Sequence, residues 1–468
     1  MRKIAFLFAF LAGCAAGPDY VRPQIEAPAQ YKELQGWRQA EPRDALPRGS
    51  WWTMFGDREL DALMARVDLS NQTLRAAEAR FRQSRALADQ ARAALFPALS
   101  ANASATRSKS PSLSNQPSFA VGAVNNYNVA LNTSWELDVW GRVRRSVEAG
   151  EAGWQASAAD LEAARLSAYA ALVQNYFALR VADATRQVLE DTVAAYARTL
   201  ELTRNRYAAG VVARVDVVQA EVQWKSARAQ LVDVGVERAQ LEHAIALLVG
   251  EAPAAFSIER APFAASMPAI PVGLPSELLE RRPDIAAAER NAAAANARIG
   301  VAQAAFFPTI TLSGAAGFRS TDSASLFTTP SRFWSLGGAL AQAVFDGGLR
   351  EAQKQQAIAV YDEDAATYRQ TVLTAFQEVE DNLAALRILE EEARLQDEVV
   401  QAARHALELT TNQYQAGIVS YLNVISAQTT LLSNERTASS LLGRRLTASV
   451  ALVKASGGGW SAESLPRR

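Results

Sequence analysis

The sequence carries an internal duplication, so any fold that it adopts must contain the same structural unit twice. One series of matched positions is separated by 211 residues: Leu74, Ala77, Glu78 and Pro97 match Ile285, Ala288, Glu289 and Pro308. A second series is separated by 207 residues and pairs Leu200-Glu201-Leu202-Thr203 with Leu407-Glu408-Leu409-Thr410. Matches at fixed separations indicate a repeated unit. We therefore divide the chain into two repeats, residues 57–273 and 274–455.

Each repeat contains a stretch that favours two very long helices. Proline, which breaks helices, is absent from residues 118–252 and from residues 331–465, each 135 residues long. In the first stretch a helical pattern runs from Val143 to Tyr207, which corresponds to roughly 95 Å of helix. Gly210 and Gly417 follow the two patterns, and glycine tolerates the left-handed backbone of a turn. We expect a long antiparallel helical hairpin in each repeat, turning at these glycines.

Residues spaced alternately by four and three predict which sides of these helices meet. In the first repeat the predicted contact row is Leu189, Val193, Tyr196, Leu200, Thr203 and Tyr207, continued after the turn by Val211, Val215, Val218 and Val222. In the second repeat it is Val400, Ala403, Leu407, Thr410 and Tyr414, continued by Ile418, Leu422, Ile425 and Thr429. Helices of this length predict a coiled coil or a tube.

Between the helices lie four segments with the two-residue alternation of β-strands, residues 98–106, 127–138, 309–318 and 333–345. The clearest has Tyr127, Val129, Leu131, Thr133, Trp135 and Leu137 on one face and Asn128, Ala130, Asn132, Ser134, Glu136 and Asp138 on the other. The other apolar faces carry Leu99, Ala101, Ala103, Ala105, Ile310, Leu312, Ala316, Phe318, Trp334, Leu336, Leu340 and Val344. Any one segment alone could be the edge strand of a soluble sheet.

Four such segments at duplicated positions favour a membrane sheet with an apolar face toward lipid. Four strands are too few to close a barrel, and an open edge in lipid leaves backbone groups unpaired. Several chains must therefore share one barrel.

The N-terminus has the layout of a bacterial export signal. Arg2 and Lys3 precede an apolar run that is too short to cross a bilayer as a helix. Small residues then lead to Cys14, the only cysteine, in an order that resembles a lipoprotein processing site. We expect residues 1–13 to be a signal peptide and Cys14 to carry the lipid. The alternative is an ordinary signal peptide with an incidental cysteine.

Two further segments flank the repeats. Residues 14–56 contain several prolines and are expected to lie extended over the folded body. Residues 456–468 form a C-terminal tail, in which Gly457-Gly458-Gly459 indicates a flexible linker.

Composition and motifs argue against several classes of function. A formal charge of −1 gives no electrostatic reason to bind nucleic acid. A single cysteine excludes a disulfide framework and a cysteine metal site. His243 and His405 lie far apart in helical patterns and are expected at the surface. No motif assembles a nucleophile, a base and an orienting group, so we expect neither catalysis nor a metal or other cofactor.

The motifs resemble those of the TolC-like outer membrane factors, in particular the lipoprotein branch that includes the NodT-type efflux proteins. They are Gly17-Pro18-Asp19-Tyr20, Trp51-Trp52 with Phe55-Gly56-Asp57 and Leu60, and Leu274-Pro275-Ser276-Glu277-Leu278-Leu279-Glu280-Arg281-Arg282-Pro283-Asp284-Ile285 with Ala288-Glu289-Arg290 and Phe307-Pro308. The resemblance covers nearly the whole mature chain.

This resemblance implies a mainly α protein with transmembrane β-structure. Three chains would combine their hairpins in a periplasmic α-barrel and their four strands each in a shared twelve-stranded β-barrel in the lipid of the outer membrane. The implied function is the exit duct of a tripartite efflux pump that passes small molecules such as drugs. The implied partners are a periplasmic adaptor protein and an inner-membrane pump, commonly of the resistance-nodulation-division type.

The resemblance also implies a gate at the periplasmic end, held by a tyrosine–aspartate contact between hairpins. Tyr414 and Asp216 occupy those positions, although Asp216 could instead cap a helix start. Leu422 and Ser426 share a helix face that would line the pore, whereas the contact row places Leu422 in the coiled-coil core. Many members carry acidic residues where Asn423 and Ser426 stand here, so a strongly cation-attracting gate is in doubt. Val419 likewise replaces an arginine used in some latches.

The hairpin tips are candidates for docking the adaptor. The tip residues are Gly210, Val211, Val212, Gly417, Ile418 and Val419. Exposed valine and isoleucine at a turn favour a docking surface; simple turn chemistry is the alternative.

Two other functions fit parts of the pattern. A duct for type I protein secretion would share the architecture, but the lipoprotein motifs favour small-molecule efflux. A coiled-coil lipoprotein scaffold without a pore would leave the amphipathic strands unexplained.

Overall fold

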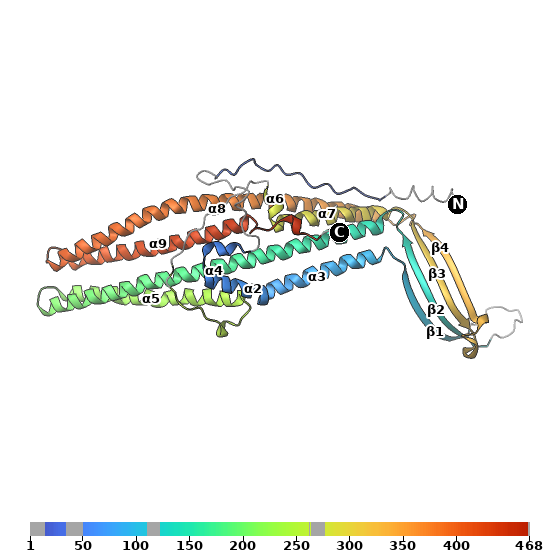
Figure 1. Ribbon diagram of the computed structural model, residues 1–468, viewed down its shortest axis with the longest axis horizontal. Coiled ribbons are helices and arrows are strands. Elements are labelled where there is room, and N and C mark those ends of the chain that lie inside the picture. Colours follow the sequence, from blue (N-terminus) through green and yellow to red (C-terminus); the bar gives the residue numbers. More distant parts are fainter. Residues whose placement is uncertain (1–14, 34–49, 110–121, 262, 264–276, 467–468) are drawn as a thin grey trace.

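The computed structural model describes residues 15–33, 50–109, 122–261, 263 and 277–466. These residues form a long helical body that continues at one end into a four-stranded sheet (Figure 1). The expected signal peptide, residues 1–13, and Cys14 lie outside the described residues. Among the helices of the described part, none is long and apolar enough to cross a membrane.

The duplication appears as three pairs of helices of equal length. The pairs are α3 (Gln72–Ala93) and α7 (Pro283–Ala304), 22 residues each; α4 (Arg142–Ala208) and α8 (Leu349–Gln415), 67 each; and α5 (Arg214–Leu248) and α9 (Tyr421–Ala455), 35 each. The shorter elements are η2 (Trp51–Phe55), α2 (Arg58–Ser70), η3 (Pro253–Ala255), α6 (Leu278–Arg281), η5 (Ser323–Ser325), η6 (Thr329–Ser331) and η7 (Ala462–Ser464). Helix α4 pairs with α5, α8 pairs with α9, and α4 also contacts α9 (Figure 1). The predicted duplication and both long hairpins are confirmed.

The sheet contains β1 (Ala98–Ser108), β2 (Val124–Leu137), β3 (Thr309–Ser320) and β4 (Arg332–Ala341), antiparallel and in that order. All four predicted strands are present. The fourth ends at Ala341 rather than at residue 345. The reason is that its partner β3 begins at Thr309, which pairs with Ala341, so the residues that follow have no strand to pair with.

The two long helices begin with the same corner. Gly141 and Gly348 both have positive φ, 81° and 93°, which glycine adopts without strain. An aspartate precedes each corner: Asp138 accepts hydrogen bonds from the backbone N–H of Val143 and Arg144, and Asp346 from Gly348 and Arg350. Because these carboxylates satisfy free N–H groups of the first turn, they fix the passage from sheet to helix.

The main core lies where the two repeats meet in the middle of the helical body. It joins residues of both repeats, among them Trp51 (η2), Leu60 (α2), Tyr176 (α4), Ile285 (α7) and Tyr368 (α8). The N-terminal segment then crosses this region on the outside. Tyr20 donates to the Glu289 carboxylate at 2.8 Å, and Arg22 donates to the Tyr368 hydroxyl at 3.0 Å.

The glycine run near the C-terminus is packed, contrary to the expected flexible linker. Gly457 and Gly458 are buried. A Cβ at Gly457 would lie 2.0 Å from the Arg281 carbonyl oxygen, just as one at Gly250 would lie 2.2 Å from the Ser70 carbonyl oxygen. The glycines therefore permit a close backbone approach that the fold makes in both repeats.

The predicted contact rows are right on the outgoing helices, except for Tyr207, which is exposed, and mostly wrong on the returning helices. On α4, Leu189, Tyr196, Leu200 and Thr203 are buried, and on α8, Val400, Ala403 and Tyr414 are buried. On α5 the valines of the predicted row are exposed, whereas Ala220, Ala227 and Val234 are buried. On α9, Tyr421, Val424 and Gln428 are buried, and Leu422 is 58% exposed. Small residues let α5 approach α4 closely, which leaves the larger valines on its other side.

Candidate functional site: the polar sheet face and the hairpin tips

The strand pairing gives the sheet two chemically different faces. The apolar face consists of Leu99, Ala101, Ala103, Ala105, Arg107, Asn125, Tyr127, Val129, Leu131, Thr133, Trp135, Leu137, Ile310, Leu312, Gly314, Ala316, Phe318, Ser320, Arg332, Trp334, Leu336, Gly338 and Leu340. The polar face is rich in asparagine, serine and threonine and includes Ser100, Asn102, Ser104, Thr106, Asn126, Asn128, Asn132, Ser134, Glu136, Thr311, Ser313, Arg319 and Ser335. The predicted division between a lipid-facing and a water-facing side therefore agrees with the register.

The polar face has hydrogen bonds of its own. The Asn132 side-chain amide donates to the Asn102 amide oxygen at 2.9 Å across β1 and β2. Neutral amides and hydroxyls suit a wet channel wall because they bond water without holding a charged solute.

At the opposite end of the molecule, both hairpins turn through the same structure. Gly210 and Gly417 have φ of 74° and 78°, as the sequence predicted. The next residue closes each helix: Val211 N–H donates to the Arg206 carbonyl, and Ile418 N–H to the Gln413 carbonyl, both at 2.9 Å. Val211 and Ile418 are exposed at the tips.

A small apolar cluster joins the two hairpins just behind these tips. Leu200, Ala220, Tyr414, Tyr421 and Val424 form its buried part, and Val212 and Val419 pack against it half-buried. The ring centroids of Tyr414 and Tyr421 lie 5.4 Å apart. Two of the predicted docking residues, Val212 and Val419, thus also contribute to the contact between hairpins.

The predicted gate residues lie close to this cluster but do not form the expected hydrogen bond within one chain. The Tyr414 hydroxyl is buried and has no hydrogen-bond partner among the described residues. Asp216 lies in the first turn of α5, where Ala213 is the N-cap residue. Burial raises the pKa of Tyr421 well above its usual value, and the negative charge of Asp216 adds to this shift. The tyrosine–aspartate latch stays a prediction for the assembled protein.

Arg206, which the sequence analysis missed, makes a polar link between the two hairpins close to their tips. Its Nη1 atom donates to the Tyr414 carbonyl at 2.6 Å and to the Gln415 carbonyl at 3.3 Å. Its guanidinium carbon lies 4.6 Å from the Tyr414 ring centroid. An arginine from α4 therefore binds carbonyls of the last turn of α8, at the negative end of its dipole; the Tyr414 carbonyl also accepts the Gly417 N–H at 3.0 Å. The sequence offers one hint of this role. The 207-residue separation matches Arg206 with Gln413, so the two repeats differ in charge at this position.

The remaining predicted gate residues are Leu422 and Ser426, and for Leu422 the sequence left two positions open, the pore wall and the coiled-coil core. Leu422 is exposed, so within one chain it does not belong to the coiled-coil core. Ser426 is also exposed, and its hydroxyl donates to the Leu422 carbonyl at 3.1 Å. His243 and His405 are exposed, as expected. Across the described part of the chain, no three His, Cys, Asp or Glu side chains are grouped as metal ligands would be.

The chain was compared with known proteins. The family model described as outer membrane efflux protein matches residues 63–251 and 274–458. The pyoverdine export outer membrane protein OpmQ of Pseudomonas aeruginosa is 32% identical over 470 residues, covering 99% of this chain and 98% of the relative. The toluene efflux pump outer membrane protein TtgC of Pseudomonas putida is 33% identical over 456 residues, covering 96% and 93%.

Solved structures agree with this result. The outer-membrane channel OprN superimposes with a TM-score of 0.89 at 31% identity, covering 96% of this chain and 100% of that one. The open state of the Neisseria gonorrhoeae channel MtrE gives a TM-score of 0.84 at 30% identity, covering 96% and 99%. The fold, the two-faced sheet and these relationships lead to one conclusion: the chain belongs to the outer membrane efflux protein family and is an outer-membrane efflux channel.

Proposed function

We propose that three copies of this chain form the exit duct of a tripartite efflux pump that passes small molecules to the exterior. The observation that carries the proposal is the open sheet. Strands β1 and β4 are its two edges, and each has a partner on one side only. An unpaired edge in lipid costs several kcal/mol for each free backbone group. Three sheets of four strands joined edge to edge would leave no edge free.

The helices favour the same assembly. Within the chain the outer helices are α5 and α8, since α4 and α9 lie between them. Both carry exposed apolar rows: Val215, Val218, Val222, Ala229, Val232 and Val236 on α5, and Ile388, Leu395, Val399, Ala402, Ala406 and Leu409 on α8. Their spacing of four and three residues is that of packed helices. A neighbouring copy would bury the α5 row of one chain against the α8 row of the next.

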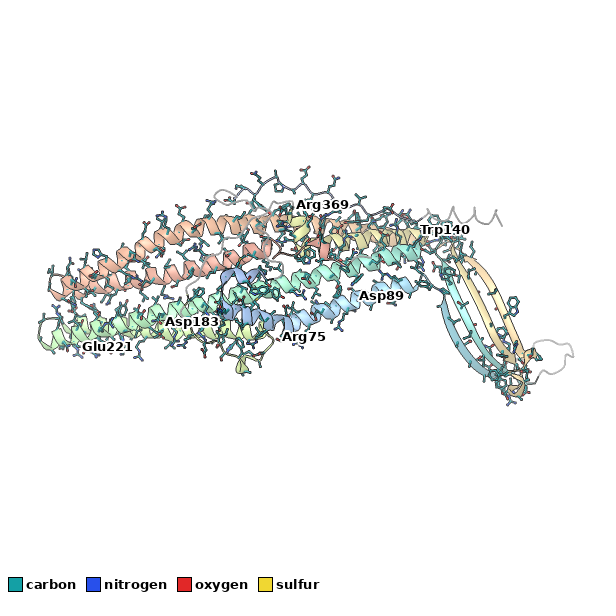
Figure 2. All side chains as sticks on the ribbon, in the orientation of Figure 1. Arg75, Asp89, Trp140, Asp183, Glu221 and Arg369 are labelled. Carbon is teal, nitrogen blue, oxygen red and sulfur yellow. The ribbon has the colours of Figure 1, made fainter. Side chains whose placement is uncertain are left out.

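The lipid anchor on Cys14 is supported by the residues that follow it. Ala16 N–H donates to the Trp140 carbonyl at 2.8 Å, and Arg145 donates to the Ala16 carbonyl at 3.2 Å. A Cβ at Gly141 would lie 2.8 Å from the Ala15 Cα. Trp140 stands at the junction between the helical body and the sheet (Figure 2). A lipid on Cys14 would therefore start at the level where the membrane begins.

The proposed gate and the proposed docking surface for partner proteins lie at the hairpin tips, the end of the molecule opposite the sheet. The tips, with exposed Val211 and Ile418, would dock a periplasmic adaptor that connects the duct to an inner-membrane pump, commonly of the resistance-nodulation-division type. Arg206 joins the two hairpins of one chain, whereas Gln413 offers a neighbouring chain no charge. Opening would then include separation of the two hairpins that Arg206 joins within each chain. The protein acts by conduction and catalyses no reaction.

Two measurements test the proposal. Native mass spectrometry of the detergent-purified protein should give a mass of three chains. Planar-bilayer recording of the same preparation should give stable single-channel conductance. A monomeric mass with no conductance would support the poreless scaffold instead, and transport of an unfolded polypeptide in reconstituted vesicles would favour the secretion duct.

A further inference from the structure

The apolar face of the sheet carries charge at one end only. Its charged side chains on the four described strands are Arg107 and Arg332, and it bears no carboxylate. Arg107 is the penultimate residue of β1, and Arg332 is the first residue of β4. Both positions are at the end of the sheet away from the helices (Figure 1). A face that contacts lipid thus ends in two cations at its outer rim.

Arg332 has no acidic partner among the residues that the structure describes. It is exposed, it makes no ion pair with any described carboxylate, and its guanidinium carbon lies 5.9 Å from the Phe318 ring centroid. The carboxylate of Asp322, in the connection between β3 and β4, accepts the Ala324 N–H. Trp334, two residues along the same face, is 76% exposed. Tryptophan marks the boundary between hydrocarbon and headgroups, so Arg332 lies at the headgroup level, where an arginine costs little.

A groove begins beside Trp334 and runs toward the middle of the sheet. Its volume is about 310 Å³, and its lining includes Leu131, Gly314, Ala316, Trp334 and Leu336. Gly314 pairs with Leu336 and Ala316 pairs with Trp334, so two small residues form a floor between large apolar walls. A Cβ at Gly314 would lie 3.0 Å from Thr133 Cγ2 and 3.2 Å from Leu336 Cδ2. Glycine at this position therefore keeps the groove open.

We propose that this groove and Arg332 form a binding site for a phosphorylated lipid of the bilayer. One acyl chain would lie in the groove over Gly314 and Ala316, and the phosphate would bind the Arg332 guanidinium. At about 3.4 Å per residue, Arg332 lies about 7 Å from Trp334 and about 14 Å from Leu336 along the strand. This separation suits a headgroup phosphate above the first carbons of its own chain.

The two parts of the site contribute differently. An acyl chain gains no hydrophobic free energy by leaving other lipid, so the groove contributes shape and van der Waals contact. The guanidinium can give a phosphate two parallel hydrogen bonds, which are strengthened by charge. The phosphate should therefore determine which lipid binds. The proposal requires the sheet to lie in the bilayer, and it holds for one chain's sheet whatever the number of subunits.

The test uses the purified channel in detergent with phosphatidic acid and with diacylglycerol of the same acyl chains, and native mass spectrometry counts bound lipid. Wild type should prefer phosphatidic acid. Arg332→Gln should weaken that binding roughly tenfold or more, as expected for loss of a charge-assisted bond, and leave diacylglycerol binding unchanged. Arg319→Gln is the matched control, because Arg319 lies on the adjacent strand at the same end, on the polar face against Phe333.

The groove is tested separately by Gly314→Leu, which should weaken the binding of both lipids. Equal phosphatidic acid binding by Arg332→Gln and Arg319→Gln, or equal wild-type binding of the two lipids, would overturn the proposal. If Arg332→Gln does not fold, Arg332→Lys and Gly314→Leu decide the matter. Lysine keeps the charge but not the paired geometry, so binding between that of wild type and that of Gly314→Leu supports the site, and wild-type binding in both variants refutes it.

Discussion

Arg206 gives the sharpest test of the proposed gate at the hairpin tips. We consider Arg206→Gln, which gives the first repeat the residue that the second has at Gln413. The change removes a charged donor from the Tyr414 and Gln415 carbonyls and a cation from the face of the Tyr414 ring. We expect the hairpins of one chain to separate more easily, and the channel to conduct for a larger fraction of the time.

The size of the effect follows from these contacts. A hydrogen bond to a charged group contributes about 1.5–3 kcal/mol, and a cation over an aromatic ring at an exposed site about 0.5–1 kcal/mol. Arg206 is half-buried, so we use the lower ends of these ranges, which give about 2 kcal/mol per chain. That corresponds to roughly 30-fold in the equilibrium between joined and separated hairpins.

Single-channel recording measures this directly. Arg204→Gln is the control, since it removes the same charge from the exposed surface of the same helix. Arg206→Gln should raise the open fraction at least tenfold, and Arg204→Gln should leave it unchanged. Equal open fractions in the two variants would refute the role of Arg206. If Tyr414→Phe combined with Asp216→Ala opens the channel and Arg206→Gln does not, the tyrosine–aspartate latch forms in the assembly and holds the gate.

Three further predictions concern the anchor, the tips and the pore. Cys14→Ser should abolish incorporation of a radiolabelled fatty acid while the sheet still inserts, and retained label would contradict the anchor. Val212→Asp and Val419→Asp should reduce drug efflux and cross-linking to the proposed adaptor without lowering the yield of the proposed trimer; unchanged cross-linking in both would exclude the tips as the docking surface. Because Asn423 and Ser426 bring no negative charge, divalent cations added on the periplasmic side should block the channel only weakly, and tight block would reveal an anionic ring elsewhere.

The sequence predicted the architecture because duplication and alternation are properties of the chain itself. The equal helix lengths, the turns at Gly210 and Gly417 and the two faces of the sheet all follow from local spacing. Local spacing did not predict which side of the returning helices, α5 and α9, packs against the rest of the chain. A helix in the wall of a tube contacts a neighbour on each of two sides. On α5 the stronger apolar row belongs to the exposed side, and the side toward α4 uses Ala220 and Ala227. A pattern of apolar residues cannot tell which neighbour each side meets.

Arg206 and the buried glycines were missed for a related reason. Their roles depend on backbone atoms of distant segments, the carbonyls of Tyr414 and Arg281, which leave no mark in residue type. An arginine near a helix end is more often a solvated surface charge. Three consecutive glycines more often form a flexible linker. Only the packed chain distinguishes these meanings.

The contacts between the two repeats indicate what a neighbouring chain must supply. Trp140, which follows β2, stacks on Phe307 of the second repeat with ring centroids 5.0 Å apart. Phe96 is the counterpart of Phe307 in the first repeat, but it is 71% exposed, and Phe345, which follows β4, is 90% exposed. Inside one chain, Trp140 after β2 packs on Phe307 before β3, whereas Phe345 after β4 and Phe96 before β1 both remain exposed. The second repeat has Gly347 where the first has Trp140, so a contact between copies cannot repeat the Trp140–Phe307 stack. Phe345 of one copy and Phe96 of the next are the exposed rings left for it, and the ring of subunits closes only when the last copy meets the first.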